Sequence, residues 1–298
     1  MPDLIAIDAG PAASVKIASR AGFTGLDLRI NRFADEIERV GVESLAEAIA
    51  AAGLRPGYCS LTPQKINVRP SVWNEELLDL PRRARIAAEL GFARATSVVL
   101  PFHDEMAFDD NMAMHRSRVN AAAEILSDHG ISFGLEYVSP LSRRRGQPNG
   151  FVHDLNGLLE LLDGINADNT GVMLDCFHWH CAGESADDLR RLRPEQIIAV
   201  HVNDLIAGVP VDEQAVTERE LPGQTGIIDI ATFLRTLDGI GYEGPITSEP
   251  THARWKSVED EPAAAQTCNA IVACLARAGI GGAEPTHQPR SDAAGSTA

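Results

Sequence analysis

The sequence predicts an α/β protein folded as a (β/α)8 TIM barrel in a single domain. Eight short apolar runs alternate with longer helical stretches over residues 1–280, which is the order of elements in this barrel. The runs are apolar throughout, as expected for strands that are buried on both faces. An open doubly wound sheet is the alternative. The first turn, Asp8-Ala9-Gly10-Pro11, lacks the GxGxxG sequence that usually accompanies that sheet.

The predicted strands are short segments bounded by turn residues or by helical stretches. They cover residues 4–8, 25–30, 55–61, 95–100, 132–137, 171–174, 197–202 and 245–248. With a helix after each strand, the segments make up eight βα units, the number that closes this type of barrel.

The predicted helices lie between these strands. They cover residues 12–21, 42–52, 74–90, a stretch ending near 129, 155–162, 186–192, 228–237 and 262–278. Gly53 follows the second helix as a C-terminal glycine. Asp154 is expected to cap the helix that begins at 155, and Asp109 or Asp110 the helix that ends near 129.

Composition narrows the class of protein. The 298 residues carry a formal net charge of −16, which opposes binding to a phosphate backbone and argues against a nucleic-acid partner.

The segment 281–298 is rich in Gly, Ala, Ser, Pro and Thr, so we expect a disordered tail. No secretory signal or membrane span is recognisable. Reduced thiols and a cytoplasmic location are expected because the cysteines are scattered without a CxxC pair: Cys59, Cys176, Cys181, Cys268 and Cys274.

Four neighbouring predicted strands end in residues that can bind a metal ion. Glu136, Asp175, His201 and Glu249 follow or close the fifth, sixth, seventh and eighth strands. The sixth ends in the sequence LDCFHWH, where the strand is expected to become a loop that carries His178. Because reactive groups of TIM barrels lie at the carboxyl ends of the strands, we expect these side chains to converge.

Three packed carboxylates would repel one another and lose hydration, and a divalent cation removes that conflict. Oxygen-rich ligation with one nitrogen favours one Mn²⁺, Co²⁺ or Mg²⁺ ion over a structural Zn²⁺. Singly, each residue has an ordinary alternative. Asp175 suits a loop cap and His201 a buried core position, while Glu136 could pair with an arginine of 143–145 and Glu249 could be a solvated strand end.

The residues at the ends of these four strands resemble those of the xylose-isomerase-like TIM-barrel superfamily. The resemblance extends over about residues 3–279. The specific segments are LDCFH (174–178), HVND (201–204), LPGQTGIID (221–229) and Glu249-Pro250. That superfamily includes sugar isomerases and epimerases, inosose dehydratases and isomerases, hydroxypyruvate isomerase and endonuclease IV. The resemblance implies one divalent metal ion, with Mn²⁺ first and Co²⁺, Mg²⁺ or Zn²⁺ as alternatives. Its implied ligands are Glu136, Asp175, His201 and Glu249.

The resemblance also implies an activity. The expected enzyme is an isomerase or epimerase of a sugar or cyclitol that moves a proton next to a carbonyl through a metal-stabilised enediolate. Glu136 and Glu249 are the implied proton carriers, and His178 and Arg219 the implied substrate contacts. Two positions depart from the epimerase pattern. Ser142 stands where a second glutamate is usual, and Gln224 replaces a glutamate after Pro-Gly.

Several alternatives remain open. The serine at 142 leaves room for a lyase or dehydratase acting on a keto-sugar or inosose. An endonuclease IV-like phosphodiesterase and a non-catalytic accessory barrel are further alternatives, and a homo-oligomer is expected by analogy. Among weaker substrate contacts, His103 follows the fourth strand and Trp179 the sixth, while His252 and Trp255 follow the eighth. Ordinary loop packing would explain each of these four residues equally well.

Overall fold

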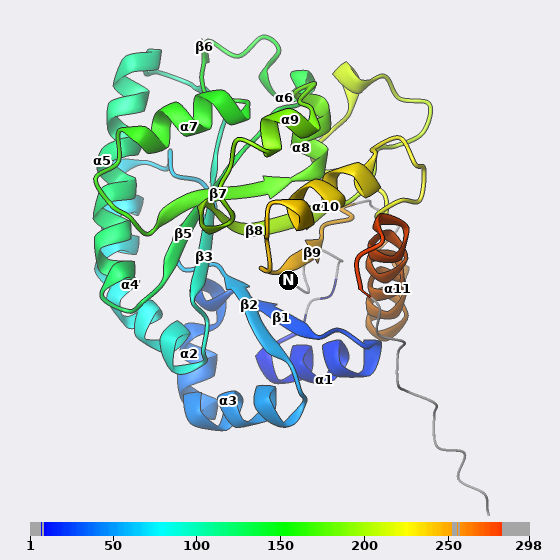
Figure 1. Cartoon of the computed structure of the whole chain (residues 1–298). Helices are drawn as coiled ribbons and strands as arrows, with labels where there is room; N and C mark the ends of the chain where they lie inside the picture. Colours follow the sequence, from blue (N-terminus) through cyan, green and yellow to red (C-terminus); the bar gives the residue numbers. More distant parts are fainter. Residues whose placement is uncertain (1–6, 8, 252–254, 256, 282–298) are drawn as a thin grey trace, which may run out of the picture.

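A curled sheet of seven parallel strands forms the centre of the molecule (Figure 1). The computed structural model describes residues 7, 9–251, 255 and 257–281. The strands lie side by side in chain order: β1 (Gly25–Leu28), β2 (Arg55–Cys59), β3 (Arg94–Val99), β5 (Ser132–Tyr137), β7 (Thr170–Asp175), β8 (Ile197–Val202) and β9 (Ile246–Ser248). A separate antiparallel pair joins β4 (Phe102–His103) to β6 (Asn149–Gly150).

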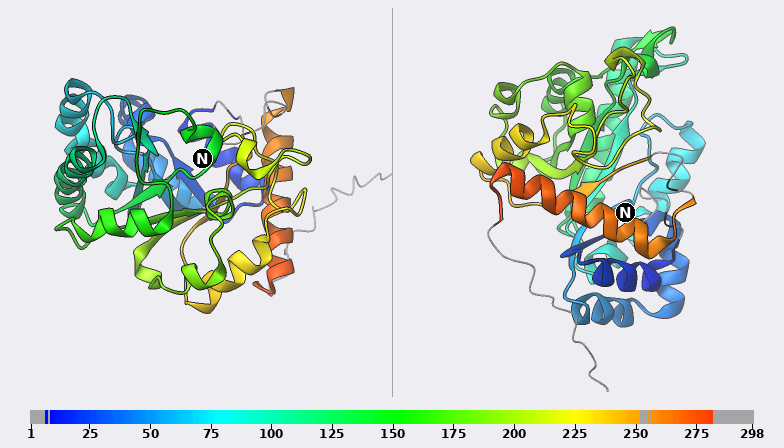
Figure 2. Two further views of the ribbon diagram at one scale, coloured as in Figure 1. Left: turned by 90° about the horizontal axis from the view of Figure 1, so that it is seen from above. Right: turned by 90° about the vertical axis from the view of Figure 1, so that its right-hand side faces the viewer.

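Helices cover the outer face of this sheet, as the view from above shows (Figure 2). The main helices are α1 (Pro11–Ala21), α2 (Ile30–Val40), α3 (Val42–Ala51), α4 (Pro70–Glu89), α5 (Phe108–Ser127), α7 (Leu155–Asp163), α10 (Ile230–Gly239) and α11 (Asp260–Ala278). Shorter turns of helix are α6 (Leu141–Arg144), α8 (Cys176–Cys181), α9 (Ala186–Leu189), η2 (Pro194–Gln196) and η3 (Val211–Glu213). None of the described helices is long and apolar enough to cross a bilayer.

Seven of the eight predicted strands occur close to their expected positions. The strand predicted over 4–8 lies outside the described residues except for Ile7, as does the tail predicted over 281–298 except for Gly281. The second predicted strand is too long, because Leu28 ends β1 and Ile30 already begins α2, a helix that was not predicted. The expected loop after Asp175 is wrong as well, because residues from Cys176 onward form α8.

Helix caps were predicted correctly in one case and wrongly in another. Asp154 caps α7, since its Oδ1 accepts a hydrogen bond of 2.8 Å from the Gly157 amide. Neither Asp109 nor Asp110 caps α5. Ala107 is the N-cap, and both aspartates lie in the first turn, where their charge still interacts favourably with the helix dipole.

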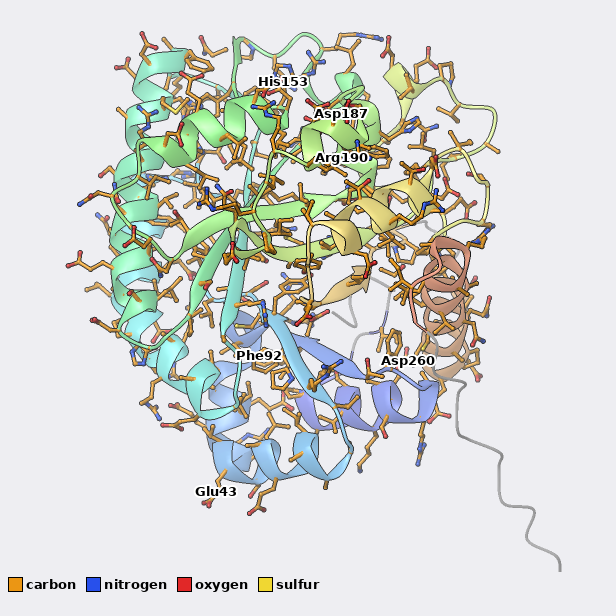
Figure 3. All side chains as sticks on the ribbon, viewed as in Figure 1. Glu43, Phe92, His153, Asp187, Arg190 and Asp260 are labelled. Atoms are coloured by element: carbon orange, nitrogen blue, oxygen red, sulfur yellow. The ribbon has the colours of Figure 1, made fainter. Side chains whose placement is uncertain are left out.

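Side-chain burial follows this layered arrangement (Figure 3). Phe92 belongs to the main hydrophobic core, whereas the side chains of Asp187 and Arg190 are largely exposed. Two glycines, one on β5 and one on β7, leave room for residues at and just before the start of β8. A Cβ atom on Gly171 would lie 2.4 Å from the Gln196 carbonyl oxygen, and one on Gly134 would crowd a side chain of β8. These three strands pack closely here, and they carry most of the candidate site.

Candidate metal centre

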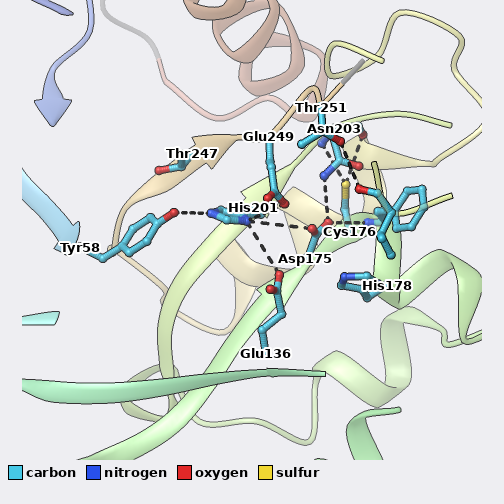
Figure 4. Close-up of polar contacts among 12 residues, drawn as sticks. Tyr58, Glu136, Asp175, Cys176, His178, His201, Asn203, Thr247, Glu249 and Thr251 are labelled. Carbon is cyan, nitrogen blue, oxygen red and sulfur yellow. Dashed lines mark hydrogen bonds and ion pairs between the residues drawn. The ribbon is translucent and has the colours of Figure 1, made fainter. Parts of the chain in front are cut away.

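The four predicted metal-binding residues converge at the carboxyl ends of adjacent strands (Figure 4). Glu136, Asp175, His201 and Glu249 each offer one ligand atom, and these atoms all lie within 4.8 Å of one another. The parallel register explains the convergence, because Asp175 pairs with His201 across β7 and β8. The Glu249 side chain is 16 % exposed and the other three are more deeply buried.

Asp175 serves both as a helix cap and as a member of the cluster, because its two oxygens have different partners. Oδ1 accepts hydrogen bonds from the Phe177 amide, at 2.8 Å, and from Asn203 Nδ2, at 3.0 Å. Oδ2 faces the cluster, 4.0 Å from His201 Nδ1. The ordinary alternative of a cap is therefore correct without excluding a place in the cluster.

Two buried atoms at the centre of the cluster lack a hydrogen-bond partner within the described part of the chain. They are Glu136 Oε1 and His201 Nδ1. These atoms lie 3.8 Å apart, and His201 Nδ1 is also 3.2 Å from Glu249 Oε2. Unsatisfied buried lone pairs are costly. Carboxylate oxygens with one imidazole nitrogen are also a donor set that divalent cations accept, so these residues fit a bound cation.

Arg219 places one positive charge against the carboxylates. Its Nη1 donates to Asp175 Oδ2, at 2.8 Å, and forms a short contact with Glu249 Oε2. The guanidinium also lies over the Phe177 ring, 4.4 Å from the ring centroid. With all three carboxyl groups ionised and the imidazole neutral, the carboxylates and the one guanidinium leave a net charge of −2, which a divalent cation balances.

The pKa values of the carboxyl groups reflect this shortage of positive charge. Burial raises the pKa of Glu136 well above its ordinary value, and the neighbouring Glu249 and Asp175 raise it further. Burial would also raise the pKa of Glu249, but Arg219 and His201 outweigh that effect and hold it below the ordinary range. One carboxyl group of the cluster thus resists ionisation while another is held ionised.

Asp204 does not join the cluster, although the sequence places it at the end of the same strand as His201. Its Oδ2 accepts hydrogen bonds from the amides of Thr225, at 3.0 Å, and Gly226, at 2.7 Å. Its Oδ1 accepts from those of Leu205, at 2.9 Å, and Ile228, at 3.2 Å. The aspartate of the HVND segment therefore fixes the backbone of the LPGQTGIID segment.

The same residue positions Arg219 through the backbone. Asp204 and Glu220 exchange two backbone hydrogen bonds of 3.0 and 2.9 Å, forming an isolated antiparallel bridge. Arg219 precedes Glu220, so this bridge brings its side chain into the cluster. The loop that carries Arg219 thus depends on a buried carboxylate outside the candidate metal site.

His178 presents a hydrogen-bond donor to the same space. Its Nδ1 accepts from the Ser139 amide at 3.3 Å, which leaves the proton of a neutral ring on Nε2. Burial, followed by the charge of Arg219, lowers the pKa of His178 well below its ordinary value, so the ring is neutral. His178 Nε2 lies 3.3 Å from Arg219 Nη2. In the tautomer with the proton on Nε2, which the Ser139 amide favours, the two groups are both donors and suit one shared acceptor, such as a substrate oxygen.

The weaker candidates have structural contacts of their own. His103 Nδ1 accepts from the amides of Glu105 and Met106, at 3.0 and 2.9 Å, within its own turn. Trp179 packs against Phe233, with ring centroids 5.4 Å apart, and its Nε1 donates to a backbone carbonyl. These contacts are typical of structural residues, so substrate binding by His103 and Trp179 stays a prediction. The described Trp255 is buried, whereas His252 lies outside the described residues.

Two residues near the cluster were not predicted from the sequence. The Tyr58 hydroxyl lies 2.6 Å from His201 Nε2, and Asn203 Nδ2 donates to Asp175. Tyr58 lies inside an apolar run that gave no signal beyond a strand. Asn203 belongs to the HVND segment but offers neither a charge nor a metal-binding nitrogen.

Glu184 lies close to the candidate site but belongs to a separate network. Its Oε2 accepts a hydrogen bond of 2.5 Å from the Tyr137 hydroxyl, and its Oε1 accepts one of 2.7 Å from the Leu155 amide. Tyr137 follows Glu136 on β5, and its ring centroid is 6.2 Å from that of His178. Burial raises the pKa of Glu184 to about 7.

We predict that Glu184→Gln changes the pH dependence of stability. Between the unfolded pKa, about 4.3, and the folded value of about 7, the folded protein holds a proton that the unfolded chain releases. The wild-type free energy of unfolding therefore loses up to about 1.4 kcal/mol per pH unit across this window. Urea unfolding at pH 5, 6 and 7 should show this fall in the wild type and a smaller one in the variant. Parallel pH profiles would contradict the assignment.

We also predict that Asp204→Asn destabilises the protein by about 2–4 kcal/mol. Whichever oxygen becomes the amide nitrogen, two backbone amides lose their acceptor. Asp212→Asn, which removes the same charge from an exposed residue of the loop before Arg219, is the matched control. Urea unfolding followed by circular dichroism measures both variants. Equal midpoints for the two variants would show that Asp204 does not hold the loop.

Comparison with known proteins agrees with this geometry. A family model described as a xylose isomerase-like TIM barrel matches residues 15–274. The inosose isomerase of Bacillus licheniformis is 26 % identical over 160 residues, 54 % of each chain. The ketose 3-epimerase of Arthrobacter globiformis is 28 % identical over 180 residues, 59 % of this chain and 54 % of its own. The chain thus spans about half the length of the curated relatives it matches.

Solved structures match over nearly the whole length. A xylose isomerase domain protein from Alicyclobacillus acidocaldarius has a TM-score of 0.83 and 29 % identity, covering 93 % of this chain and 97 % of its own. The IolI protein, solved with a zinc atom, has a TM-score of 0.75 and covers 90 % of this chain and 94 % of its own, but its identity of 18 % supports the fold alone. The TIM-barrel prediction is confirmed, and the chain belongs to the xylose isomerase-like TIM-barrel family.

Proposed function

We propose that this protein is a divalent-metal-dependent isomerase or epimerase that acts on a sugar or cyclitol. The observation that carries the proposal is the buried cluster of Glu136, Asp175, His201 and Glu249, with the unsatisfied Glu136 Oε1 and His201 Nδ1 at its centre. The names of relatives support the substrate class, since an inosose and a ketose both carry a carbonyl beside hydroxylated carbons.

The same four residues would hold the cation. Once bound, it would supply positive charge to stabilise the negative charge that develops on a carbonyl oxygen when a neighbouring carbon loses its proton. The oxygen-rich donor set favours Mn²⁺, with Co²⁺, Mg²⁺ and Zn²⁺ as alternatives. The zinc atom in the IolI structure is one reason to include Zn²⁺ in any test.

The side chains around the cluster have distinct roles in this proposal. Glu136 and Glu249 are the proton carriers, one removing the proton from carbon and the other returning one, in the order that the handedness of the substrate requires. Arg219 Nη2 and His178 Nε2 lie 3.3 Å apart and donate together to one substrate oxygen. Both groups are buried, so they are oriented before the substrate arrives.

A lyase or dehydratase acting on a keto-sugar or inosose is the second candidate function. It would share the first proton removal and then expel a leaving group from the β-carbon. Ser142 favours it, because the epimerase pattern has a carboxylate at this position. Here the Ser142 hydroxyl donates at 2.5 Å to the Gln214 carbonyl, so this side chain ties α6 to the loop after η3. A homo-oligomer, a cytoplasmic location and the absence of a nucleic-acid partner remain further proposals.

Deuterium incorporation tests the proposed function. We predict that the wild-type protein, supplied with Mn²⁺ in D₂O, places deuterium on a carbon next to the carbonyl of at least one ketose, inosose or 3-keto-glycoside. Mass spectrometry and NMR of the products would also separate isomers from dehydrated products. Glu136→Gln and Glu249→Gln should each lower the rate by about 10²–10⁴-fold because each removes a proton carrier.

Glu213→Gln removes an exposed carboxylate of η3 and should keep the wild-type rate. Circular dichroism should show that all three variants remain folded. A metal-loaded wild-type protein that exchanges no proton with any of these substrates would contradict the proposal. It would favour an accessory barrel that binds metal without turnover.

A further inference from the structure

Tyr58 lies on the side of His201 that faces away from the carboxylates (Figure 4). Its hydroxyl oxygen is 2.6 Å from His201 Nε2, and both residues are buried. The other ring nitrogen, Nδ1, faces Glu136, Asp175 and Glu249. The imidazole is therefore held between a phenol on one side and three carboxylates on the other.

This arrangement matters because a neutral imidazole has one N–H and one lone pair. A histidine that binds a cation must offer the lone pair, so its proton must be on the other nitrogen. The carboxylates favour the opposite form, with the proton on Nδ1, because Glu249 Oε2 lies 3.2 Å from Nδ1 and would readily accept a hydrogen bond from it. A buried Nε2–H group, in turn, needs an acceptor.

We propose that Tyr58 is the positioning residue that selects the Nε2–H form of His201 and thereby keeps the Nδ1 lone pair directed at the cation. The inference rests on the proposed metal site. It adds the requirement that His201 carries its proton on Nε2. The phenol oxygen accepts the Nε2 proton, and its own proton goes to another acceptor. Carboxylates and backbone carbonyls are the more common acceptors for metal-binding histidines.

Tyr58 is held in place by contacts that lead back to the same strands. Its ring packs with Met173 and Ala199, and its backbone amide donates to Asp27 Oδ1 at 3.0 Å. Asp27 Oδ2 accepts a hydrogen bond of 2.6 Å from the Thr247 hydroxyl.

These contacts form a closed circuit across four strands. Thr247 pairs with His201 between β8 and β9, so the circuit runs from β2 to β8, β9, β1 and back to β2. Gly57 makes it possible, because a Cβ atom there would lie 2.2 Å from Asp27 Oδ1. The ring and backbone of Tyr58 are therefore held by contacts that do not involve Glu136, Asp175 or Glu249.

Cation affinity gives the first test. Tyr58→Phe removes the hydroxyl and keeps the ring that packs on Met173 and Ala199. We expect it to weaken Zn²⁺ and Mn²⁺ binding by about 10–100-fold, measured by competition with a chelator of known affinity. Tyr242→Phe is the matched control. It removes the hydroxyl of a half-buried tyrosine, which donates at 2.8 Å to the Pro245 carbonyl before β9, and should bind both ions as the wild type does.

The protonated nitrogen of His201 gives a second readout, which a purely structural role would not change. Long-range ¹H–¹⁵N correlation spectra of protein labelled at histidine distinguish the two neutral forms. The His201 signals would be assigned by their loss in His201→Gln. We expect the Nε2–H form in the wild type and in Tyr242→Phe, with or without Zn²⁺. Metal-free Tyr58→Phe should shift toward the Nδ1–H form.

The outcomes separate this inference from the proposed function. If the wild type binds one cation and Tyr58→Phe binds it equally tightly with the same protonated nitrogen, the role of Tyr58 is wrong and the metal site stands. Equal weakening in Tyr242→Phe would also overturn the inference, since it would indicate a general effect of lost core hydrogen bonds. A wild type that binds no cation would remove the proposed function itself.

Discussion

Glu136, Asp175 and Glu249 bring three carboxylates into one buried space, and nearly every contact around them supplies positive charge or fixes an oxygen. Repulsion and lost hydration would cost several kcal/mol per uncompensated charge. Arg219 offsets one charge, and Asn203 and the Phe177 amide hold one oxygen of Asp175. One oxygen of each carboxylate lies within 4.0 Å of His201 Nδ1. The formal balance of −2 explains why a divalent cation, and not a second arginine, suits the centre.

The barrel makes this concentration of charge possible because its rigid strands end at a common face. β5, β7 and β8 pack closely at Gly134 and Gly171, and the register of β7 and β8 pairs Asp175 with His201. Asp204 also fixes a loop, since its carboxylate accepts hydrogen bonds from four backbone amides. Its backbone bridge to Glu220 then positions Arg219. The site is thus preorganised by groups that would never touch a substrate.

Sequence reasoning could place the four cluster residues because each follows an apolar run, and apolar runs are the clearest signal of a buried strand. It could not tell which polar residues at the strand ends belong to the metal-binding cluster and which only support the backbone. Asp204 and Asp175 look equivalent in the sequence, yet only Asp175 faces the other ligands. The six-residue helix α8 is too short to show a periodicity. The predicted strand includes Ile30, the first residue of α2, because this apolar side chain comes soon after those of β1. Tyr58 drew no prediction beyond its strand, because its contact with His201 joins residues 143 positions apart.

Anomalous diffraction from a crystal soaked in Mn²⁺ would test the central claim most directly. A single strong anomalous peak within bonding distance of Glu136, Asp175, His201 and Glu249, and absent from a soaked Asp175→Asn crystal, is the predicted result. A peak elsewhere, or no peak at this cluster after soaks with Mn²⁺, Co²⁺ and Zn²⁺, would contradict it. In that case Arg219 alone would be the counter-charge of the carboxylates.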